Sequence, residues 1–234
     1  MRDSYVKKNC RLCNDNDLNI VLPLGRTPIC DAYTKNLKDQ SFYDLNLCLC
    51  NKCGFVQIDT IVNIQNLYNE NNYLKKSPLG LQDHLKNSVA EVCDFLKLDY
   101  SGLTIDFLKD DETLLNHFKK KGHKVLGIDT RYDPPNNENI NEIVKIPVFF
   151  DTNSAKKIVS KYGKASLITI NNLLANIDNL EEYVNGINDL LDDDGVLVIE
   201  SSYLLDMIDN LVFDFIYHEH LSYFSILPLV RFFN

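Results

Sequence analysis

Residues 103–129, LTIDFLKDDETLLNHFKKKGHKVLGID, decide the fold class of this chain. The apolar run 103–108 is typical of a short buried strand, and 123–129 is typical of a second strand that ends in an acid. Between them, residues 113–121 have the apolar spacing of a helix, and Gly122 is well placed to end it. A strand, a helix and a strand in this order form a βαβ unit, which favours a parallel sheet.

The alternation of strands and helices continues toward the C-terminus, and one further helix precedes the first strand. We expect a helix from about 79 to 98, a weaker strand at 143–150, a helix at 155–162, a strand at 166–170, a helix at 180–191 and a strand at 195–200. Strands that alternate with helices of this length imply a mostly parallel sheet covered on both faces. The predicted fold class is therefore α/β.

Composition limits the class of protein. The chain has 234 residues, of which 45% are hydrophobic, enough for one domain plus a smaller module or for two small domains. No apolar run reaches the roughly 18 residues of a membrane span, and MRDSYVKKNC lacks the apolar core of a secretory signal. The net charge of −9 argues against nucleic acid as a partner. We therefore expect a cytoplasmic protein with neither a membrane nor a nucleic-acid partner.

Two Cys-x2-Cys pairs, separated by residues 14–49, indicate a zinc site made of Cys10, Cys13, Cys50 and Cys53. Four thiolates at turn spacing suit tetrahedral zinc, and they leave no open position for a substrate, so the zinc is predicted to be structural. Gly54 follows the second pair and suits a tight turn. The alternative is a set of reduced cysteines without metal, in which Cys48 is the closest decoy.

Two aspartates in the α/β region indicate a cofactor site. In such sheets, ligands bind beyond the C-terminal ends of the strands. Asp106 lies in the first predicted strand and Asp129 ends the second, where an acid commonly holds ribose hydroxyls. This spacing fits a nucleoside cofactor, although Asp129 is equally compatible with a role as a helix cap or turn residue.

The loop after the first predicted strand lacks the glycines that a nucleotide usually needs. Residues 107–112 read FLKDDE, without the glycine that lets backbone and ligand approach closely. The chain has no G-x-G-x-x-G motif, and three consecutive acids disfavour a pyrophosphate. A nicotinamide dinucleotide is therefore disfavoured, whereas a cationic sulfonium cofactor tolerates acids better.

The segment 217–224, YHEHLSYF, is the densest group of titratable side chains. From Tyr217 to His220 it carries a phenol, two imidazoles and a carboxylate. Such groups are costly to bury without partners, and they are standard acid/base tools. The segment therefore suggests chemistry. The alternative is an amphipathic stretch that only places Phe215, Leu221 and Phe224 in the core.

Taken in order, these motifs resemble the zinc-containing sugar C-methyltransferases, which methylate nucleotide-linked keto-deoxysugars with S-adenosylmethionine. Four stretches carry the likeness: LGRTPICDAY at 24–33, LNLCLCNKCGFVQ at 45–57, LLNHFKKKGHKVLGID at 114–129 and YHEHLSYFS at 217–225. The resemblance implies a small N-terminal zinc-binding module at 1–78, followed by a Rossmann-like methyltransferase domain at 79–234. Members of that family continue into a further C-terminal domain, so this chain, which stops at Asn234, is expected to be shortened and to lack part of the substrate site, unless a separate chain supplies it.

The resemblance also assigns roles to single residues. Cys10, Cys13, Cys50 and Cys53 would bind zinc, and Asp129, with Asp106 in the same site, would hold the adenosine ribose of S-adenosylmethionine. His220 would be the general base that removes a proton from the carbon next to the sugar ketone. Glu219 or Tyr217 would orient this base and help to stabilise the enolate. Tyr73 and Asn176 would lie near the sugar.

The chain departs from the family pattern at several positions. Leu108 and Glu112 stand where the family has glycine, Asn176 stands where a histidine is expected, and Lys75 replaces a second substrate-side tyrosine. These departures keep two further hypotheses open beside an active C-methyltransferase. One is a catalytically inactive, zinc-stabilised remnant that serves as a binding module. The other is a zinc-ribbon interaction module whose α/β part is only structural.

Overall fold

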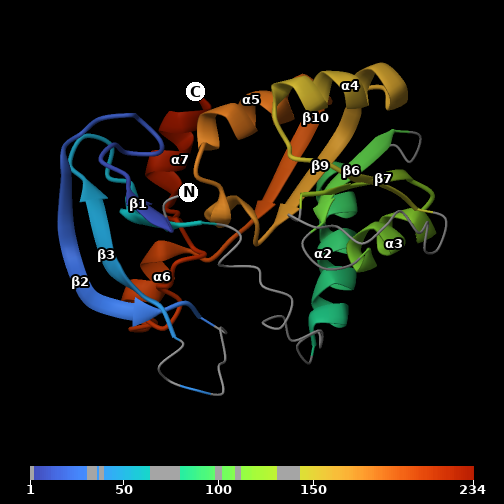
Figure 1. Ribbon diagram of the computed structural model, residues 1–234. Helices are drawn as coiled ribbons and strands as arrows, with labels where there is room; N and C mark the ends of the chain where they lie inside the picture. The colour runs from blue at the N-terminus through green and yellow to red at the C-terminus, as the bar shows by residue number, and fades with distance from the viewer. Residues whose placement is uncertain are drawn as a thin grey trace. The chain divides into compact units, whose positions relative to one another are not determined.

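The computed structural model in Figure 1 describes residues 3–30, 36, 40–63, 80–97, 102–108, 112–130 and 143–234. The chain forms two compact units. The first unit comprises Met1–Leu74, Leu174–Glu181 and Ser201–Asn234, and the second comprises Lys75–Leu173 and Glu182–Glu200. Within the described ranges, no helix combines the length and the apolar character needed to cross a membrane.

The second unit contains a sheet of five parallel strands, in agreement with the predicted α/β class. The strands are β6 (Leu103–Leu108), β7 (Lys124–Asp129), β8 (Val144–Pro147), β9 (Ala165–Asn171) and β10 (Leu191–Glu200). Their spatial order is β10-β9-β6-β7-β8, and every neighbouring pair is parallel. The chain therefore runs outward from β6 in one direction and then in the other. This doubly wound order places a topological switch point between β6 and β9.

Helices cover both faces of this sheet (Figure 1). They are α2 (Leu81–Leu96), α3 (Thr113–Lys120), α4 (Thr152–Tyr162) and α5 (Leu180–Leu190). On one face, α2 and α3 contribute apolar side chains to a core that includes Leu85, Val89, Cys93, Leu114, Phe118 and Leu167. On the other face, the Phe107 ring contacts Phe150 and Tyr183, with ring centroids 4.7 Å and 5.3 Å away.

Most element boundaries lie within a few residues of the predicted ones, and the differences have local causes. The helix predicted at 155–162 begins at Thr152 because Asp151 and Ser154 form a capping box. Each side chain accepts a hydrogen bond from the other's backbone N–H, at 2.7 Å and 2.9 Å. The strand predicted at 195–200 extends back to Leu191, with an irregular register before Val196.

Leu108, which occupies a predicted glycine position, is a core residue. Its side chain is 2% exposed and packs with Leu115 and Ile143. Gly127 on the neighbouring strand makes the necessary room, because a Cβ there would lie 2.6 Å from Cδ1 of Leu108. Leucine at position 108 and glycine at position 127 are therefore a matched pair.

The first unit is built on antiparallel sheets. A four-stranded sheet has the order β11-β4-β3-β2, and β1 pairs with β5. The strands are β1 (Ser4–Val6), β2 (Leu18–Pro28), β3 (Phe42–Cys50), β4 (Val56–Ile58), β5 (Thr60–Val62) and β11 (Ser222–Tyr223). The helices are η3 (Leu174–Asn176), α6 (Leu204–Asp209) and α7 (Ile226–Phe233). The core includes Leu45, Leu47, Val56, Ile58, Leu204, Met207, Leu221 and Tyr223.

Two segments that we expected in the α/β domain, 174–181 and 201–234, belong to the first unit. Strand β11 pairs with β4, placing Ser222 opposite Gln57. The backbone N–H of Leu221 donates to the carbonyl of Ala175 at 2.8 Å, and the carbonyl of Leu221 accepts from Ile58 at 3.1 Å. The first unit is thus closed by hydrogen bonds between three separate parts of the chain.

We predict that Gly127→Ala destabilises the protein by about 1–3 kcal/mol, because the added methyl group overpacks the site of Leu108. Urea unfolding of Gly127→Ala, Leu108→Ala and the double variant measures this effect. Leu108→Ala removes the clashing carbons, so the double variant should lose less stability than the sum of the two single variants. Additive losses would show that the two side chains do not share one space.

Candidate functional site

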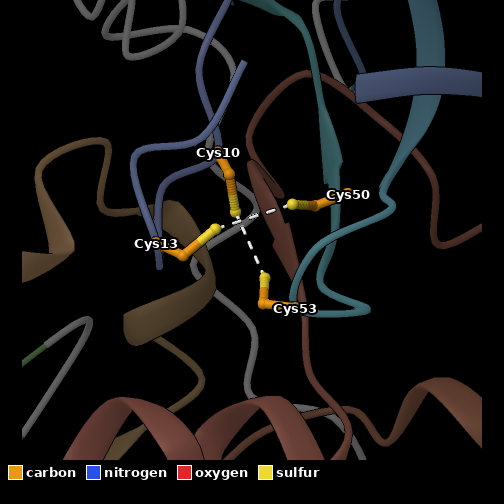
Figure 2. A group of neighbouring side chains, drawn as sticks. All are labelled: Cys10, Cys13, Cys50 and Cys53. Atoms are coloured by element: carbon orange, nitrogen blue, oxygen red, sulfur yellow. Dashed lines mark hydrogen bonds between the residues drawn. The ribbon is translucent and has the colours of Figure 1, made fainter. Parts of the chain in front are cut away.

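The four predicted zinc ligands come together in one cluster (Figure 2). The Sγ atoms of Cys10 and Cys53 lie 3.6 Å apart, as do those of Cys13 and Cys50, and all four lie within 4.8 Å of one another. Four sulfurs bound tetrahedrally to zinc at about 2.3 Å would be separated by about 3.8 Å. The spacing of the sulfurs therefore fits a zinc ion at their centre.

The two Cys-x2-Cys turns share one backbone design. In each, the residue after the second cysteine donates its N–H to the carbonyl of the first: Asn14 to Cys10 at 3.0 Å, and Gly54 to Cys50 at 2.9 Å. Both donors have positive φ, 56° for Asn14 and 78° for Gly54. Asparagine and glycine tolerate this left-handed conformation best, so the sequence around each pair favours the turn that directs both sulfurs inward.

Burial controls the protonation of these thiols. It raises the pKa of Cys10 to about 11 and moves the pKa of Cys53 further upward. Burial also opposes ionisation of Cys50, but backbone N–H groups of Cys53 and Lys52 outweigh it and lower the pKa of Cys50. Metal binding to such a cluster releases protons, because zinc is bound by thiolates. Cys48, the predicted decoy, is buried and contributes no ligand to the cluster.

A buried ion pair supports the first Cys-x2-Cys turn. The Arg11 side chain is 0% exposed, and its Nε lies 3.0 Å from Oδ1 of Asp178. Its Nη1 donates to the carbonyl of Ile58 at 2.7 Å, and its backbone N–H donates to Oε1 of Gln57 at 2.8 Å. Arg11 therefore connects the turn to β4 and to the 174–181 segment.

Asp178 receives two further donors from the N-terminal strand region. The Tyr5 hydroxyl donates to its Oδ2 at 2.7 Å, and Nζ of Lys7 lies 3.1 Å from its Oδ1. Burial alone would raise the pKa of Asp178, but the Tyr5 hydrogen bond and the charges of Arg11 and Lys7 hold it below its usual value. Asp178 is therefore ionised at neutral pH. Sequence reasoning missed this cluster, because no local pattern links residues so far apart.

Within the 217–224 segment, the structure pairs Tyr217 with His220. The Tyr217 hydroxyl lies 2.9 Å from Nε2 of His220, and the carbonyl of Phe215 lies 3.3 Å from Nδ1. A carbonyl only accepts hydrogen bonds, so these contacts assign the proton to Nδ1 and leave the Nε2 lone pair for the hydroxyl. Both side chains are half-buried.

The other residues of this segment have different environments. His218 is 0% exposed, its Nε2 donates to the carbonyl of Asp44 at 3.2 Å, and burial lowers its pKa, so it remains neutral. Glu219 is half-buried, whereas Leu221, Tyr223 and Phe224 are core residues. The packing alternative is therefore confirmed for Leu221 and Phe224 and wrong for Phe215, which is 45% exposed, whereas the acid/base role of His220 stays a prediction.

The predicted substrate residue Asn176 carries a buried amide without a partner. Neither Nδ2 nor Oδ1 makes a hydrogen bond within the described part of the chain. Asn176 follows Ala175, whose carbonyl accepts from Leu221, the residue next to His220. An unpaired buried amide is costly and often marks a place for a ligand or water. The second predicted substrate residue, Tyr73, lies outside the described residues.

The two predicted cofactor residues lie in the second unit. Asp106 is 5% exposed, and its Oδ1 accepts a hydrogen bond from the Thr169 hydroxyl at 2.6 Å, across the β6–β9 switch point. Asp129 is 3% exposed and ends β7. Glu112, at the other predicted glycine position, pairs with Lys145 of β8 at 2.5 Å. Its charge is therefore balanced, which the sequence did not reveal.

Family comparisons cover most of the chain. Residues 10–68 match a family described as "Putative zinc binding domain", and residues 82–234 match one described as a methyltransferase domain. The chain is 26% identical, over 228 residues, to C-methyltransferase NovU of Streptomyces niveus. That alignment covers 96% of this chain and 54% of the relative, so the chain spans about half of the relative's length.

Two solved structures resemble the fold more distantly. One is coclaurine N-methyltransferase bound to N-methylheliamine and SAH, with a TM-score of 0.46 and 15% identity, covering 68% of this chain and 51% of that one. The other is a SAM-dependent methyltransferase from Agrobacterium tumefaciens, with a TM-score of 0.40 and 10% identity, covering 74% of this chain and 59% of that one.

We predict that the purified protein carries one zinc ion per chain, bound by the four-cysteine cluster. Cys50→Ser should lose the metal and unfold the first unit, because a structural zinc site contributes directly to folding. Elemental analysis and circular dichroism measure the two effects. Cys30→Ser is the matched control, since Cys30 is exposed and outside the cluster. Equal zinc content in both variants would contradict the assignment.

We also predict that Asp178→Asn destabilises the protein by about 3–5 kcal/mol, because it leaves the Arg11 charge buried without a counter-charge. Asp193→Asn is the control. Asp193 pairs with Lys164 at 3.5 Å on the surface and should contribute less than about 0.5 kcal/mol.

The contribution of Asp178 to the free energy of unfolding should decrease at low pH. The folded pKa of Asp178 lies below the unfolded value of about 3.9, so its stabilisation is complete above that value and is lost as the pH falls through the folded pKa. The difference in stability between the parent and Asp178→Asn should therefore be constant above about pH 4 and shrink as the pH falls below it. A difference that stays constant at still lower pH would contradict the role of the carboxylate.

Proposed function

Because the chain belongs to the methyltransferase family whose domain spans residues 82–234, we propose that it is an S-adenosylmethionine-dependent C-methyltransferase with a structural zinc module. The likeness to a C-methyltransferase over 96% of the chain supports methylation at carbon. The motif order at 24–33, 45–57 and 217–225 supports a nucleotide-linked keto-deoxysugar as the acceptor. The chain spans 54% of that relative. The proposal therefore concerns the matched half, which contains the four-cysteine cluster, the methyltransferase domain and the proposed base.

The hydrogen bonds of His220 carry this proposal. The carbonyl of Phe215 holds the proton on Nδ1, so Nε2 presents a lone pair, as a general base requires. The Tyr217 hydroxyl at 2.9 Å fixes the direction of that lone pair. A carboxylate or carbonyl that orients an imidazole in this way is the arrangement found around catalytic histidines.

The proposed reaction begins with proton removal from the acceptor. Nε2 of His220 takes the proton from the carbon next to the ketone, and the electrons of the C–H bond form an enolate. The Tyr217 hydroxyl turns from Nε2 to the enolate oxygen and donates to it, which stabilises the developing charge. Asn176 offers both a donor and an acceptor to the sugar, since its amide makes no hydrogen bond to the described residues. S-adenosylmethionine, when bound, would supply the methyl group to the enolate carbon, and the electrons of the broken S–CH3 bond would stay on sulfur, which leaves S-adenosylhomocysteine.

The edge of the second unit's sheet fits this cofactor. Ligands of such sheets commonly bind at the switch point, here beside the C-terminal ends of β6 and β9, and Asp129 ends β7, where an acid commonly holds ribose hydroxyls; both support the proposal. Leu108 lies in the core against Gly127, and Glu112 is paired with Lys145. The two missing glycines are therefore replaced by side chains that have their own partners.

The second candidate function is a catalytically inactive, zinc-stabilised module that binds a partner. The absence of glycine from 107–112 favours it, because close approach of a cofactor to the backbone usually needs glycine. Cofactor affinity separates the two candidates. Calorimetry with S-adenosylmethionine should show binding if the first is correct, whereas no binding up to millimolar concentration supports the second.

We predict that His220→Gln lowers proton removal from the acceptor by about 10²–10⁴-fold while cofactor affinity is unchanged. In D2O without cofactor, the parent should exchange the hydrogen next to the ketone for deuterium, which mass spectrometry detects. Tyr217→Phe should slow the same exchange. His117→Gln on α3 is the matched control and should behave like the parent. Exchange by His220→Gln at the parent rate would reject His220 as the base.

A further inference from the structure

His84, Glu200 and Asn172 form a hydrogen-bonded network at the C-terminal edge of the second unit's sheet, and the reaction proposed above does not use it. His84 lies in the first turn of α2, Asn172 follows β9 and Glu200 ends β10. Nε2 of His84 donates to Oε2 of Glu200 at 2.7 Å, and Nδ2 of Asn172 donates to Oε1 at 3.0 Å. Both oxygens of the carboxylate are thus held in place.

The backbone fixes Asn172 for this role. Its N–H donates to the carbonyl of Glu200 at 2.8 Å, so backbone and side chain both engage the same residue. Its φ of +51° lies in the left-handed region, which asparagine adopts more readily than most residues. The turn after β9 therefore positions Glu200 with two hydrogen bonds from one residue.

The network has the chemistry of a site for a cation with N–H donors. The bond to the carboxylate places the proton of a neutral His84 on Nε2, which leaves an acceptor lone pair on Nδ1. No hydrogen bond in the described part of the chain engages Nδ1 of His84. The side chains of His84 and Glu200 are 51% and 32% exposed, so a ligand can reach them. The Glu200 carboxylate and, in this tautomer, Nδ1 of His84 both offer hydrogen-bond acceptors, which suits a primary ammonium group.

The network also lies where one end of a cofactor is expected. Ligands of such sheets bind beside the switch point, here between β6 and β9. The first turn of α2 crosses this point, since Gln82 donates to Thr113 at the start of α3 at 3.2 Å while His84 reaches the end of β10. Strands are spaced by about 4.8 Å, so the end of β10, where Glu200 lies, is about 14 Å along the edge from Asp129 on β7. The two acidic side chains with their hydrogen bonds would span part of this distance, and the amino-acid chain of S-adenosylmethionine, which extends from its ribose, would span the rest.

We propose that the His84–Glu200 pair binds the α-ammonium group of S-adenosylmethionine. The ammonium donates hydrogen bonds to the Glu200 carboxylate and to Nδ1 of His84, and Asn172 positions Glu200 for this contact. The inference rests on the proposed function, because it assumes that cofactor. It assigns the ribose to the β7 end of the sheet edge and the amino-acid portion to the β9–β10 end.

Two ligands that differ at the amino-acid end test the proposal. S-adenosylhomocysteine has the α-ammonium and α-carboxylate, whereas 5′-methylthioadenosine shares the adenosine and the thioether but lacks both. Glu200→Gln should weaken binding of S-adenosylhomocysteine about ten- to a hundredfold, the range of a hydrogen bond to a charged group, and leave 5′-methylthioadenosine affinity unchanged. His84→Gln, on the exposed surface of α2, should show the same selectivity with a smaller effect.

The matched control is Asp83→Asn, which removes an equal charge from an exposed side chain in the same turn of α2. It should bind both ligands like the parent. If Glu200→Gln and His84→Gln weaken both ligands equally, or neither ligand, this proposal is overturned while the proposed function stands. If the parent protein binds neither ligand, both are overturned. A selective loss of S-adenosylhomocysteine binding supports the contact, because a general loss of folding would affect both ligands.

Discussion

The buried guanidinium of Arg11 is the constraint on which the first unit depends. It lies between two zinc-ligand positions in sequence, and it binds Asp178, the carbonyl of Ile58 and, through its backbone, Gln57. Three separate parts of the chain therefore meet at one cation. An isolated charge inside a protein is strongly unfavourable, so Asp178 contributes to the stability of the unit by pairing with Arg11. The four-cysteine cluster fixes the turn that carries Arg11, which couples metal binding to the position of the 174–181 segment.

Features that depend on residues close together in the chain were predicted from the sequence. Apolar periodicity gave the five parallel strands and their helices, and the spacing of Cys10, Cys13, Cys50 and Cys53 gave the sulfur cluster. Contacts between distant residues were not predictable. The pairing of β11 with β4 and the Arg11–Asp178 ion pair each join positions more than a hundred residues apart, and no local pattern encodes them.

The 217–224 segment shows how burial divides a dense set of titratable groups. His218 is enclosed and neutral, and it anchors the segment to β3 through the carbonyl of Asp44. His220 is half-buried and hydrogen-bonded to Tyr217. The sequence identified the segment but not this division, because two histidines two residues apart look equivalent until their surroundings are known. The packed histidine and the edge strand β11 give the proposed base a rigid support, which a placed general base requires.

The contact between Leu108 and Gly127 bears on how this chain can change over evolutionary time. Leucine at position 108 favours glycine at 127, since a Cβ there would lie 2.6 Å from Cδ1 of Leu108 and force that side chain to move. A return to glycine at 108 would in turn leave a cavity beside Leu115 and Ile143. The residue at each position thus determines how much stability a mutation at the other position costs. This dependence of one mutation's effect on another residue is epistasis. A chain that carries this pair therefore exchanges either residue alone only by way of a less stable form.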